Sequence, residues 1–569
     1  MVDKIRNHLE RTDQAYYLNR YTAVSGIGDQ HTHDIQIRDI NTHIRQLDNY
    51  GTIFTPLSID TYGNGEAQKK FFNQLNEGCG VFTYFGHGAE QFLGKDGKFF
   101  SAGDVYKLKN TVLPLAGFGG CQITNTDRGY RGLGETLVTA TPHGCIGTIV
   151  SARDTWSGQN LEFFKQFFIC LYKEGSTSKT EHNYDPVTIG EVYANVKHFS
   201  TYSNELAYQL LCDPALVIPT INRPISVHIS GGKDNVLVPG EKMSFSGEIL
   251  NKDGKTDSKY NGQVVLRLCE PEKLIAANNI ESGEDTGALQ YYYRDEQISS
   301  AVADVKDGKF EIEIHAPASL ASFTAGQTEV DKENGPKALL YFTAYDPRTK
   351  TGAGQSYTMA LGLQPAASTE STDNVPPVIE SLVFNGDNCA ISLAVSDNVA
   401  LNLATNPLNK GLYLYIDGKE RTEAHFAEAI LESGRAAYSK LVMLDGIEYG
   451  DHTARLKVKD AAGNSSEQEI TFTYQPAIGK YMIARSESST PESTLIEAVG
   501  DMPVEAALVI MNSTGREIWR GDFRGGNARW NHEDNTGMKV QPGHYKAYII
   551  ETGTSALKGH SETIDIPVI

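Results

Sequence analysis

Short apolar runs alternate with stretches of helical spacing over the first 220 residues. The apolar runs predict strands, and the stretches with apolar residues every three or four positions predict helices. Strands are predicted at 15–26, 52–60, 79–88, 111–121 and 144–152, and helices at 2–13, 35–49, 66–78, 101–110 and 133–142. The strands are almost continuously apolar, as in a mostly parallel sheet covered by helices on both faces. This region is therefore predicted to be α/β.

Beyond residue 220 the pattern changes to strict alternation of apolar and polar positions between turn residues, which is typical of antiparallel sandwiches. A segment rich in Pro, Ser and Thr at 364–377 has the composition of a linker. A chain of 569 residues is also too long for one core. We expect an α/β domain at 1–218 followed by three all-β, Ig-like sandwich modules at 219–364, 365–476 and 477–569.

Charge and composition exclude several classes of function. The net charge of -20 disfavours a nucleic-acid partner. No run reaches the roughly 18 apolar residues of a membrane helix, and the first residues lack a signal-peptide core. A domain seldom opens on a helix with no strand before it, so we expect the chain to be a fragment with its N-terminal part missing.

The seven cysteines are widely spaced and form no C-x-x-C pair, which supports neither a zinc ribbon nor a disulfide scaffold. Most lie in apolar runs and are expected to be small core residues. The acidic turn at 251–259 is not a full calcium loop. No metal and no cofactor are expected.

Two consecutive predicted strands of the α/β region end in reactive side chains, His87 and Cys121. Open α/β sheets bind ligands at the carboxyl ends of their strands. The 34 positions from 87 to 121 (121 - 87) suit one strand-helix-strand crossover, whose usual right-handed form places the strands side by side. Imidazole and thiol would then face one cleft.

That pairing suits nucleophilic catalysis, because an ordinary thiol with a pKa of about 8.5 needs a nearby base to become a thiolate at neutral pH. A lone histidine after a strand is more often a polar loop residue, and a lone cysteine is usually inert. His31, His33 and His143 are rival histidines. The polar loop that holds His31 and His33 also leaves a metal-binding role open, although such loops are commonly only solvated.

Four segments in order, at 84–94, 113–138, 144–156 and 205–219, resemble the gingipain-type cysteine peptidases of family C25, which have a caspase-like fold. The resemblance implies a catalytic dyad of His87 and Cys121. It also implies oxyanion donors at the backbone amides of Gly88 and Cys121, and a substrate-pocket wall at Trp156. The upstream half of the family's peptidase domain has no counterpart in this sequence. The residues after Cys121 also differ from the family's pattern, so the substrate preference is expected to differ.

The β-modules resemble those behind the peptidase in the sortases of type IX secretion, and the last one also resembles hook-capping and sorting domains. This implies a surface or outer-membrane-associated enzyme of Bacteroidota-type bacteria. Such an enzyme cuts C-terminal sorting domains from exported proteins and passes the acyl group to a lipopolysaccharide anchor. Its partners would be protein substrates, lipopolysaccharide and other secretion components.

Other readings stay open. Asp29 and Asp34, in the loop after an upstream strand, are candidates for a carboxylate that orients His87, although a solvated-loop role fits them equally. Trp156 could equally be an ordinary half-buried aromatic. The alternatives to a sortase are a secreted protease that only hydrolyses, and a non-catalytic surface module for adhesion or docking.

Overall fold

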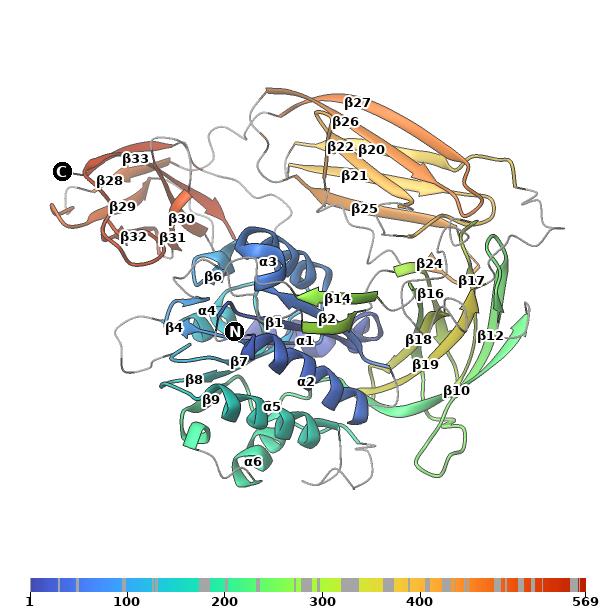
Figure 1. Cartoon of the computed structure of the whole chain (residues 1–569). Coiled ribbons are helices and arrows are strands. Elements are labelled where there is room, and N and C mark those ends of the chain that lie inside the picture. Colours follow the sequence, from blue (N-terminus) through green and yellow to red (C-terminus); the bar gives the residue numbers. More distant parts are fainter. Residues whose placement is uncertain are drawn as a thin grey trace.

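The structure is a computed structural model of the whole chain (Figure 1). It describes residues 2–568 apart from 29–30, 48–50, 95–98, 125–126, 128–130, 173–184, 200–202, 232–235, 271–272, 278–288, 294–296, 319–336, 362–372, 387–388, 405–409, 422–430, 435, 445–446, 448–449, 475–481, 487–488, 500–505, 513–516, 524, 553–560 and 562.

A six-stranded sheet forms the centre of the first region, in the order β2-β1-β3-β7-β8-β9. The strands are β1 (Arg20–Ser25), β2 (Ile53–Ser58), β3 (Val81–Phe85), β7 (Leu115–Gly119), β8 (Gly147–Ser151) and β9 (Tyr208–Leu211). All pairs are parallel except β8 with β9, which is antiparallel. The sheet is thus mixed, and the prediction of a mostly parallel α/β sheet is confirmed.

Helices cover both faces of this sheet and enclose one apolar core on each side. The helices are α1 (Val2–Glu10), α2 (Thr32–Leu47), α3 (Ile59–Glu77), α4 (Leu133–Thr139), α5 (Ser157–Tyr172) and α6 (Ile189–Phe199). Side chains of α2, α5 and α6 share one core, and those of α3 and α4 share the other. The strands β2, β3, β7 and β8 are buried along their whole length, and β1 is buried apart from its first residue, Arg20, because both faces of the sheet are covered.

The helix predicted at 101–110 differs from the structure. This segment forms the end of β6 (Phe100–Ser101), followed by the 3-10 turn η3 (Asp104–Lys107). The carboxylate of Asp104 accepts hydrogen bonds from the backbone and hydroxyl of Ser101, both at 2.8 Å. A local side-chain bond of this kind competes with helix formation, which explains the single turn. Two further short strands, β4 (Gly88–Ala89) and β5 (Phe92–Leu93), pair with β6 in a small sheet.

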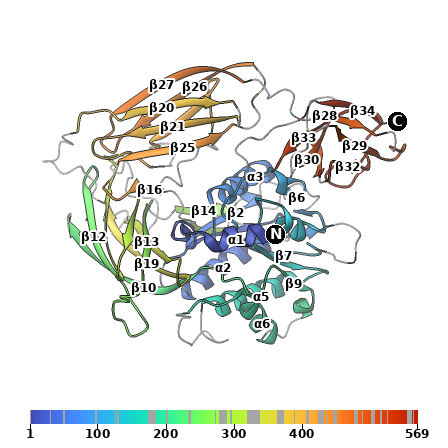
Figure 2. The same cartoon turned by 180° about the vertical axis from the view of Figure 1, so that it is seen from behind.

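The second region is dominated by a nine-stranded, mostly antiparallel sheet beside the α/β region (Figures 1 and 2). Its strands are β10 (Ile221–Gly231), β11 (Val236–Leu237), β12 (Lys242–Ile249), β13 (Gly262–Cys269), β16 (Gln297–Val305), β17 (Lys309–His315), β18 (Lys337–Asp346), β19 (Thr351–Leu361) and β24 (Leu431–Glu432). A hairpin of β14 (Lys273–Ala277) and β15 (Leu289–Tyr293) extends from it along the α/β region. The short strand β24 comes from the next region of the chain, so the two β regions share one ladder.

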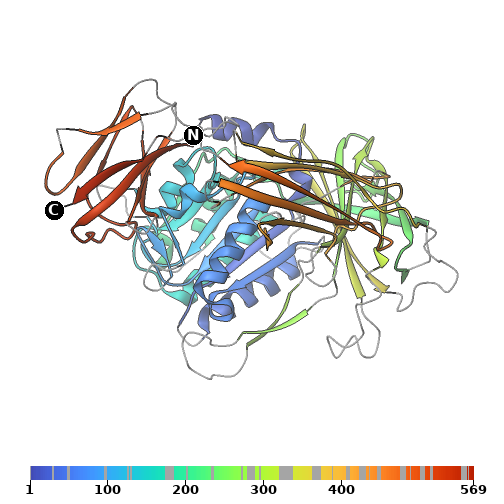
Figure 3. The ribbon, with the colours of Figure 1, turned by 90° about the horizontal axis from the view of Figure 1, so that it is seen from above.

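The third and fourth regions each contain two small antiparallel sheets around one apolar core. The third has β20 (Val378–Asn385), β21 (Ala390–Ser396), β22 (Leu412–Ile416), β23 (Lys419–Glu420), β25 (Ala437–Met443), β26 (Gly450–Lys459) and β27 (Ser465–Tyr474). The fourth has β28 (Met482–Arg485), β29 (Thr494–Val499), β30 (Ala506–Met511), β31 (Glu517–Asp522), β32 (Asn527–Trp530), β33 (Gly543–Glu551) and β34 (Ile564–Val568). The α/β region lies between the nine-stranded sheet and the fourth region (Figures 1 and 3).

Candidate active site

Two neighbouring parallel strands bring His87 and Cys121 to one edge of the sheet. β3 and β7 are hydrogen-bonded partners, with Phe85 opposite Gly119. The ladder continues one step further, where the N–H of Gly86 donates to the carbonyl oxygen of Gly119 at 3.2 Å. His87 and Cys121 each lie two residues beyond the pair formed by Phe85 and Gly119, so they leave the sheet at the same level. The expected adjacency of these strands is confirmed.

The sulfur of Cys121 is half-buried against the loop that follows β8. The backbone N–H of Thr155 donates to Sγ at 3.4 Å. In the opposite direction, Sγ lies 3.6 Å from the carbonyl oxygen of Thr155, to which the thiol can donate. This loop therefore holds the sulfur in either protonation state.

Other cysteines of the α/β region are poor nucleophiles. Burial raises the pKa of the Cys79 thiol to about 12 and raises that of Cys145 further. Burial, aided by the charge of Asp213, raises the pKa of Cys212 to about 12. Since a thiolate is the reactive form, these thiols are suited to packing. In the described part of the chain no cysteine is joined in a disulfide.

His87 is exposed at the end of β3, beside the loop that follows β1. Its ring meets the edge of the His33 ring, with the centroids 5.7 Å apart and the planes at 83°. A Cβ placed on Gly28 would lie 3.9 Å from His87 Nε2, so that loop passes close to the imidazole. The imidazole thus faces Gly28 and His33 on one side and solvent on the other.

The glycines around the two residues allow the strand ends to approach each other. A Cβ on Gly120 would meet the carbonyl oxygen of Gly86 at 2.7 Å, and one on Gly88 would meet Ile123 Cδ1 at 2.2 Å and the Cys121 carbonyl oxygen at 3.2 Å. The contact at Gly120 is with a backbone oxygen and leaves no room for a Cβ, and a Cβ at Gly88 would require the Ile123 side chain or the Gly88 backbone to move. The glycines are required first by packing between the strand ends, which brings the Gly88 backbone up to the backbone of Cys121.

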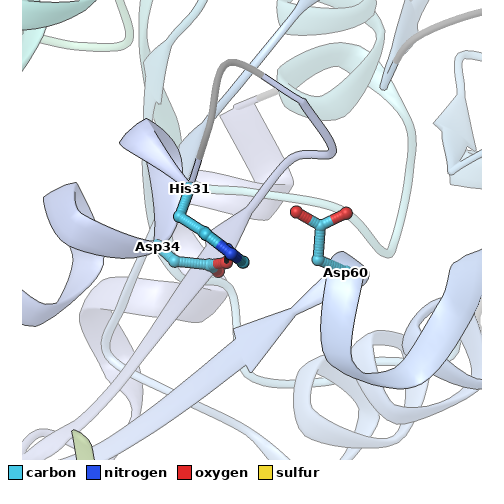
Figure 4. A group of neighbouring side chains, drawn as sticks. All are labelled: His31, Asp34 and Asp60. Atoms are coloured by element: carbon cyan, nitrogen blue, oxygen red, sulfur yellow. Dashed lines mark hydrogen bonds and ion pairs between the residues drawn. The ribbon is translucent and has the colours of Figure 1, made fainter. Parts of the chain in front are cut away.

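His31, Asp34 and Asp60 form a buried group at the ends of β1 and β2 (Figure 4). One carboxylate oxygen of Asp34 accepts the Ser25 hydroxyl, and the other lies 3.3 Å from His31 Nδ1. One nitrogen and two carboxylate oxygens lie within 4.8 Å of one another. A nitrogen and two carboxylate oxygens are ligand types that suit a divalent cation, but both oxygens of Asp34 are already engaged, one by Ser25 and the other by His31.

The expectation that His31, His33 and Asp34 belong to a solvated loop is wrong. Their exposed fractions are 6%, 4% and 1%. Helix α2 begins at Thr32, so His33 and Asp34 lie in its first turn, where the helix meets the sheet edge. A carboxylate in a first helical turn is favoured by the helix dipole, and this accounts for Asp34 without a role toward His87. Asp29 lies outside the described residues.

Of the rival histidines, His143 lies at the opposite end of the sheet. Its Nδ1 is 3.0 Å from the carbonyl oxygen of Asn110. It precedes β8, where the N–H of Ile146 bonds the carbonyl oxygen of Pro114 just before β7. That is the amino end of both strands, so His143 is remote from Cys121.

Trp156 follows Thr155 directly, and its side chain is 72% exposed. Its backbone is fixed on both sides by Asn204, whose Oδ1 accepts from the Trp156 N–H at 3.0 Å and whose Nδ2 donates to the Trp156 carbonyl at 2.8 Å. An exposed indole on an anchored backbone next to Cys121 can contact a bound peptide. The alternative of an ordinary half-buried aromatic does not fit this exposure.

Several residues of the site escape reasoning from the sequence. Gln122 has a left-handed φ of 52°, and it is tied to the loop after β8 through the Arg153 carbonyl at 3.1 Å and the Asp154 carboxylate at 2.8 Å. Thr155 contacts the sulfur, and its hydroxyl is bonded by Asn160 at 3.1 Å. A non-glycine residue with positive φ beside a nucleophile is a known form of local strain at functional sites. No pattern in the sequence marks these positions, because each acts through a tertiary contact.

A family model assigns the region that carries this site to a class. Residues 1–219 match the model of peptidase family C25, so the first region of the chain is similar to that family of cysteine-type peptidases. In the part of the chain that the structure describes, no helix has the length and apolar character needed to span a membrane.

Individual proteins similar to the chain are remote. PorU from Porphyromonas gingivalis, in a dimeric latent form, is 20% identical over 70% of this chain and 40% of its own, with a TM-score of 0.30. Gingipain R, an Arg-specific cysteine proteinase, is 16% identical over 63% of this chain and 71% of its own, with a TM-score of 0.34. Halomucin from Haloquadratum walsbyi is 25% identical over 252 residues, which is 43% of this chain and 2% of that protein. The chain thus spans less than half of the length of PorU.

Proposed function

We propose that the chain is a cysteine endopeptidase in which Cys121 is the nucleophile and His87 is the general base and acid. The observation that supports this most strongly is the parallel register of β3 and β7, which ends both strands at the same level. The match of residues 1–219 to family C25 supports it independently. The proposed oxyanion donors are the N–H groups of Gly88 and Cys121, and the proposed pocket wall is Trp156.

The proposed reaction proceeds through a thioester. The thiol proton of Cys121 moves to the imidazole of His87, and the thiolate attacks the carbonyl carbon of the scissile bond. The N–H groups of Gly88 and Cys121 stabilise the oxyanion. The C–N bond then breaks, and the imidazolium gives its proton to the departing amine. Water or another amine attacks the thioester and restores the thiol.

A carboxylate could orient the imidazole, and Asp29 and Asp34 are the candidates from the sequence. Asp34 is hydrogen-bonded to Ser25 and His31. From this position Asp34 would affect His87 only indirectly, through the neighbouring residues His31 and His33. The dyad of Cys121 and His87 is therefore sufficient for the mechanism proposed.

We also propose the finer architecture. The α/β region would have the caspase-like form of gingipain-type peptidases, and the β regions would be Ig-like sandwiches, with domains at 1–218, 219–364, 365–476 and 477–569. Separate apolar cores in the second, third and fourth regions support this division. The strand β24, which joins the sheet of the preceding region, indicates that the second and third domains pack firmly.

We propose further that the enzyme is a surface sortase of type IX secretion in a Bacteroidota-type bacterium. It would cut C-terminal sorting domains from exported proteins and transfer the acyl group to an amine of lipopolysaccharide. The family match and the several β regions behind the peptidase region support this role. No cofactor is required by the chemistry, because thiol, imidazole and amides supply every step.

The test uses the full chain with a fusion protein that ends in a sorting domain, in buffer with and without a simple amine acceptor. The products are weighed by mass spectrometry for the wild type and for Cys121→Ala. The sortase role predicts a Cys121-dependent product that carries the amine. A product with a free carboxylate in both buffers would instead indicate a peptidase that only hydrolyses. Substrate that binds but stays intact would contradict catalysis and favour a docking module.

A further inference from the structure

The sulfur of Cys121 is surrounded by hydrogen-bond donors of Thr155. The Thr155 N–H donates to Sγ at 3.4 Å, and its hydroxyl oxygen lies 4.0 Å from the same sulfur. Both groups come from one residue on the loop after β8, and this loop is tied to the sheet edge by the bond from Gln122 N–H to the Arg153 carbonyl at 3.1 Å. A thiolate at this position would meet two donors besides the imidazole.

Asn160, in the first turn of α5, fixes the direction of the Thr155 hydroxyl. Its Nδ2 donates to Thr155 Oγ1 at 3.1 Å, so the hydroxyl oxygen acts as the acceptor there and its own proton is available for another bond. The side chain of Asn160 is buried, with an exposed fraction of 2%. It therefore has no solvent to bond in place of Thr155.

Two donors settle which way the Asn160 amide points. The Tyr208 hydroxyl and Asn204 Nδ2 each donate to Asn160 Oδ1 at 2.7 Å. Burial raises the pKa of Tyr208 well above its ordinary value, with a smaller contribution from Cys121, so this phenol stays a protonated donor. The amide nitrogen of Asn160 must then face Thr155, because its oxygen is occupied twice.

We propose that Thr155 stabilises the Cys121 sulfur as a thiolate through its N–H and its hydroxyl, and that Asn160 is a positioning residue that aims this hydroxyl. When the thiol ionises, its proton goes to His87, and the S–H contact to the Thr155 carbonyl is lost. The sulfur then accepts a hydrogen bond from the Thr155 hydroxyl in addition to the one from the Thr155 N–H. Hydrogen bonds to a charged acceptor are stronger and shorter, so the 4.0 Å contact is expected to contract as the charge forms. The inference deepens the proposed function, since it assumes that Cys121 is the nucleophile.

The test measures the rate of alkylation of Cys121 by iodoacetamide against pH, with the adduct located by mass spectrometry. Thr155→Val keeps the shape of the side chain and the backbone N–H but removes the hydroxyl. It should move the pH midpoint of alkylation upward by about 1–2 units, the range expected for one hydrogen bond to a charged group. Thr155→Ser restores the hydroxyl and should restore the midpoint.

Asn160→Asp supplies the second arm, because a carboxylate accepts the Thr155 hydroxyl proton and turns it away from the sulfur. It should move the midpoint in the same direction as Thr155→Val although Thr155 is present. The ionisable groups around the sulfur, namely His87, Arg153, Asp154 and Tyr208, are left in place by the Thr155 variants. A thermal unfolding curve identifies any variant that fails to fold, and the Thr155 pair decides the question without Asn160→Asp.

A midpoint that stays within about 0.2 unit of the wild type in Thr155→Val, or a Thr155→Ser variant that behaves like Thr155→Val, overturns the proposal. Alkylation needs no peptide substrate, so the result is separate from the proposed function. A shift in Thr155→Val together with no peptide cleavage by the wild type would uphold this inference and refute the peptidase.

Discussion

At the scale of single residues, His87 and Cys121 are placed by one kind of contact and the side chains around the sulfur by another. His87 and Cys121 each follow an apolar strand, so topology alone places them at one sheet edge. Thr155 and Asn160 carry no such signal, because their roles depend on how the loop after β8 and helix α5 fold back onto the sulfur. The polar loop that holds His31 was misjudged for the same reason, since its burial comes from the packing of α2.

The close contact between the strand ends gives a prediction for Gly88→Ala. The new Cβ would meet Ile123 Cδ1 at 2.2 Å and the Cys121 carbonyl oxygen at 3.2 Å, so the buried Ile123 side chain must rotate or the Gly88 backbone must shift away from Cys121. A displacement of about 1 Å at a reacting centre costs roughly 100-fold in rate, and we expect kcat to fall by about that factor. The measurement is steady-state cleavage of a peptide substrate.

Gly158→Ala is the matched control, because a Cβ at Gly158 has nothing within 4 Å. It lies in the first part of α5, where alanine is compatible with the helix. Equal activity of the two variants would contradict the role given to the Gly88 backbone.

At the scale of elements, apolar periodicity predicted the strands β1, β2, β3, β7 and β8 and the helices α1 to α4, because burial on both faces of the sheet makes each strand almost continuously apolar. It did not predict β9, α5 or α6. An apolar run also carries no information on strand direction, so the antiparallel pairing of β9 with β8 could not be predicted either. It also missed the interruption at Asp104, where a side-chain hydrogen bond competes with the helix. Contacts made by polar side chains between elements were equally hidden.

Lys4 is such a contact, and it joins α1 to the end of α4. Its buried ammonium donates to the carbonyl oxygens of Leu137, Val138, Ala140 and His143 at 2.8–3.1 Å. Burial lowers the pKa of Lys4 to about 8, with a small opposing effect of Cys145, so the amine is mostly charged at neutral pH. It satisfies carbonyls that a helix end leaves without partners.

Lys4→Met should therefore lower the free energy of unfolding by about 2–4 kcal/mol, because the methionine fills the space but leaves buried carbonyls unsatisfied. Chemical denaturation followed by circular dichroism measures this change. Lys69→Met, on the exposed face of α3, is the control and should change stability by less than about 0.5 kcal/mol. A similar small effect at Lys4 would contradict the capping role.

At the scale of the whole molecule, the change from α/β to β patterning near residue 220 was predictable because the period of burial changes from that of helices to that of strands. The pairing of β16 with β24, which joins the second region to the third, was not predictable from the sequence. Nor was the contact of Gly103 with Asn535, by which the fourth region meets the α/β region. Contacts between regions involve few residues, so they produce no periodic pattern in the sequence.

His8 in α1 is buried, and it lies close enough to Lys350, in the turn that joins β18 to β19, for that positive charge to affect it. Burial lowers its pKa to about 4, and the positive charges of Arg11 and Lys350 add to this effect. Between pH 6.5 and 4 the unfolded chain binds a proton at His8 and the folded chain does not. Stability from this residue is thus complete above pH 6.5 and is lost as the pH falls, by about 3 kcal/mol in total.

His8→Gln removes the titrating group, so the decline in stability from pH 6.5 to 4 should become shallower than in the wild type. Urea unfolding at a series of pH values measures it, with His228→Gln on the exposed part of β10 as the control. If His8→Gln leaves the slope of the wild type unchanged, the buried neutral histidine is not the cause.

The proposed mechanism depends most on Cys121 and His87 acting together at one sheet edge. The most direct measurement is covalent capture of the full chain by a peptide-derived electrophile, with each modified cysteine located by mass spectrometry and its rate recorded. We predict one adduct at Cys121, formed at least about 100-fold more slowly in His87→Ala. Equal modification of the partly exposed thiols of Cys121, Cys212 and Cys389, with no effect of His87→Ala, would contradict the account.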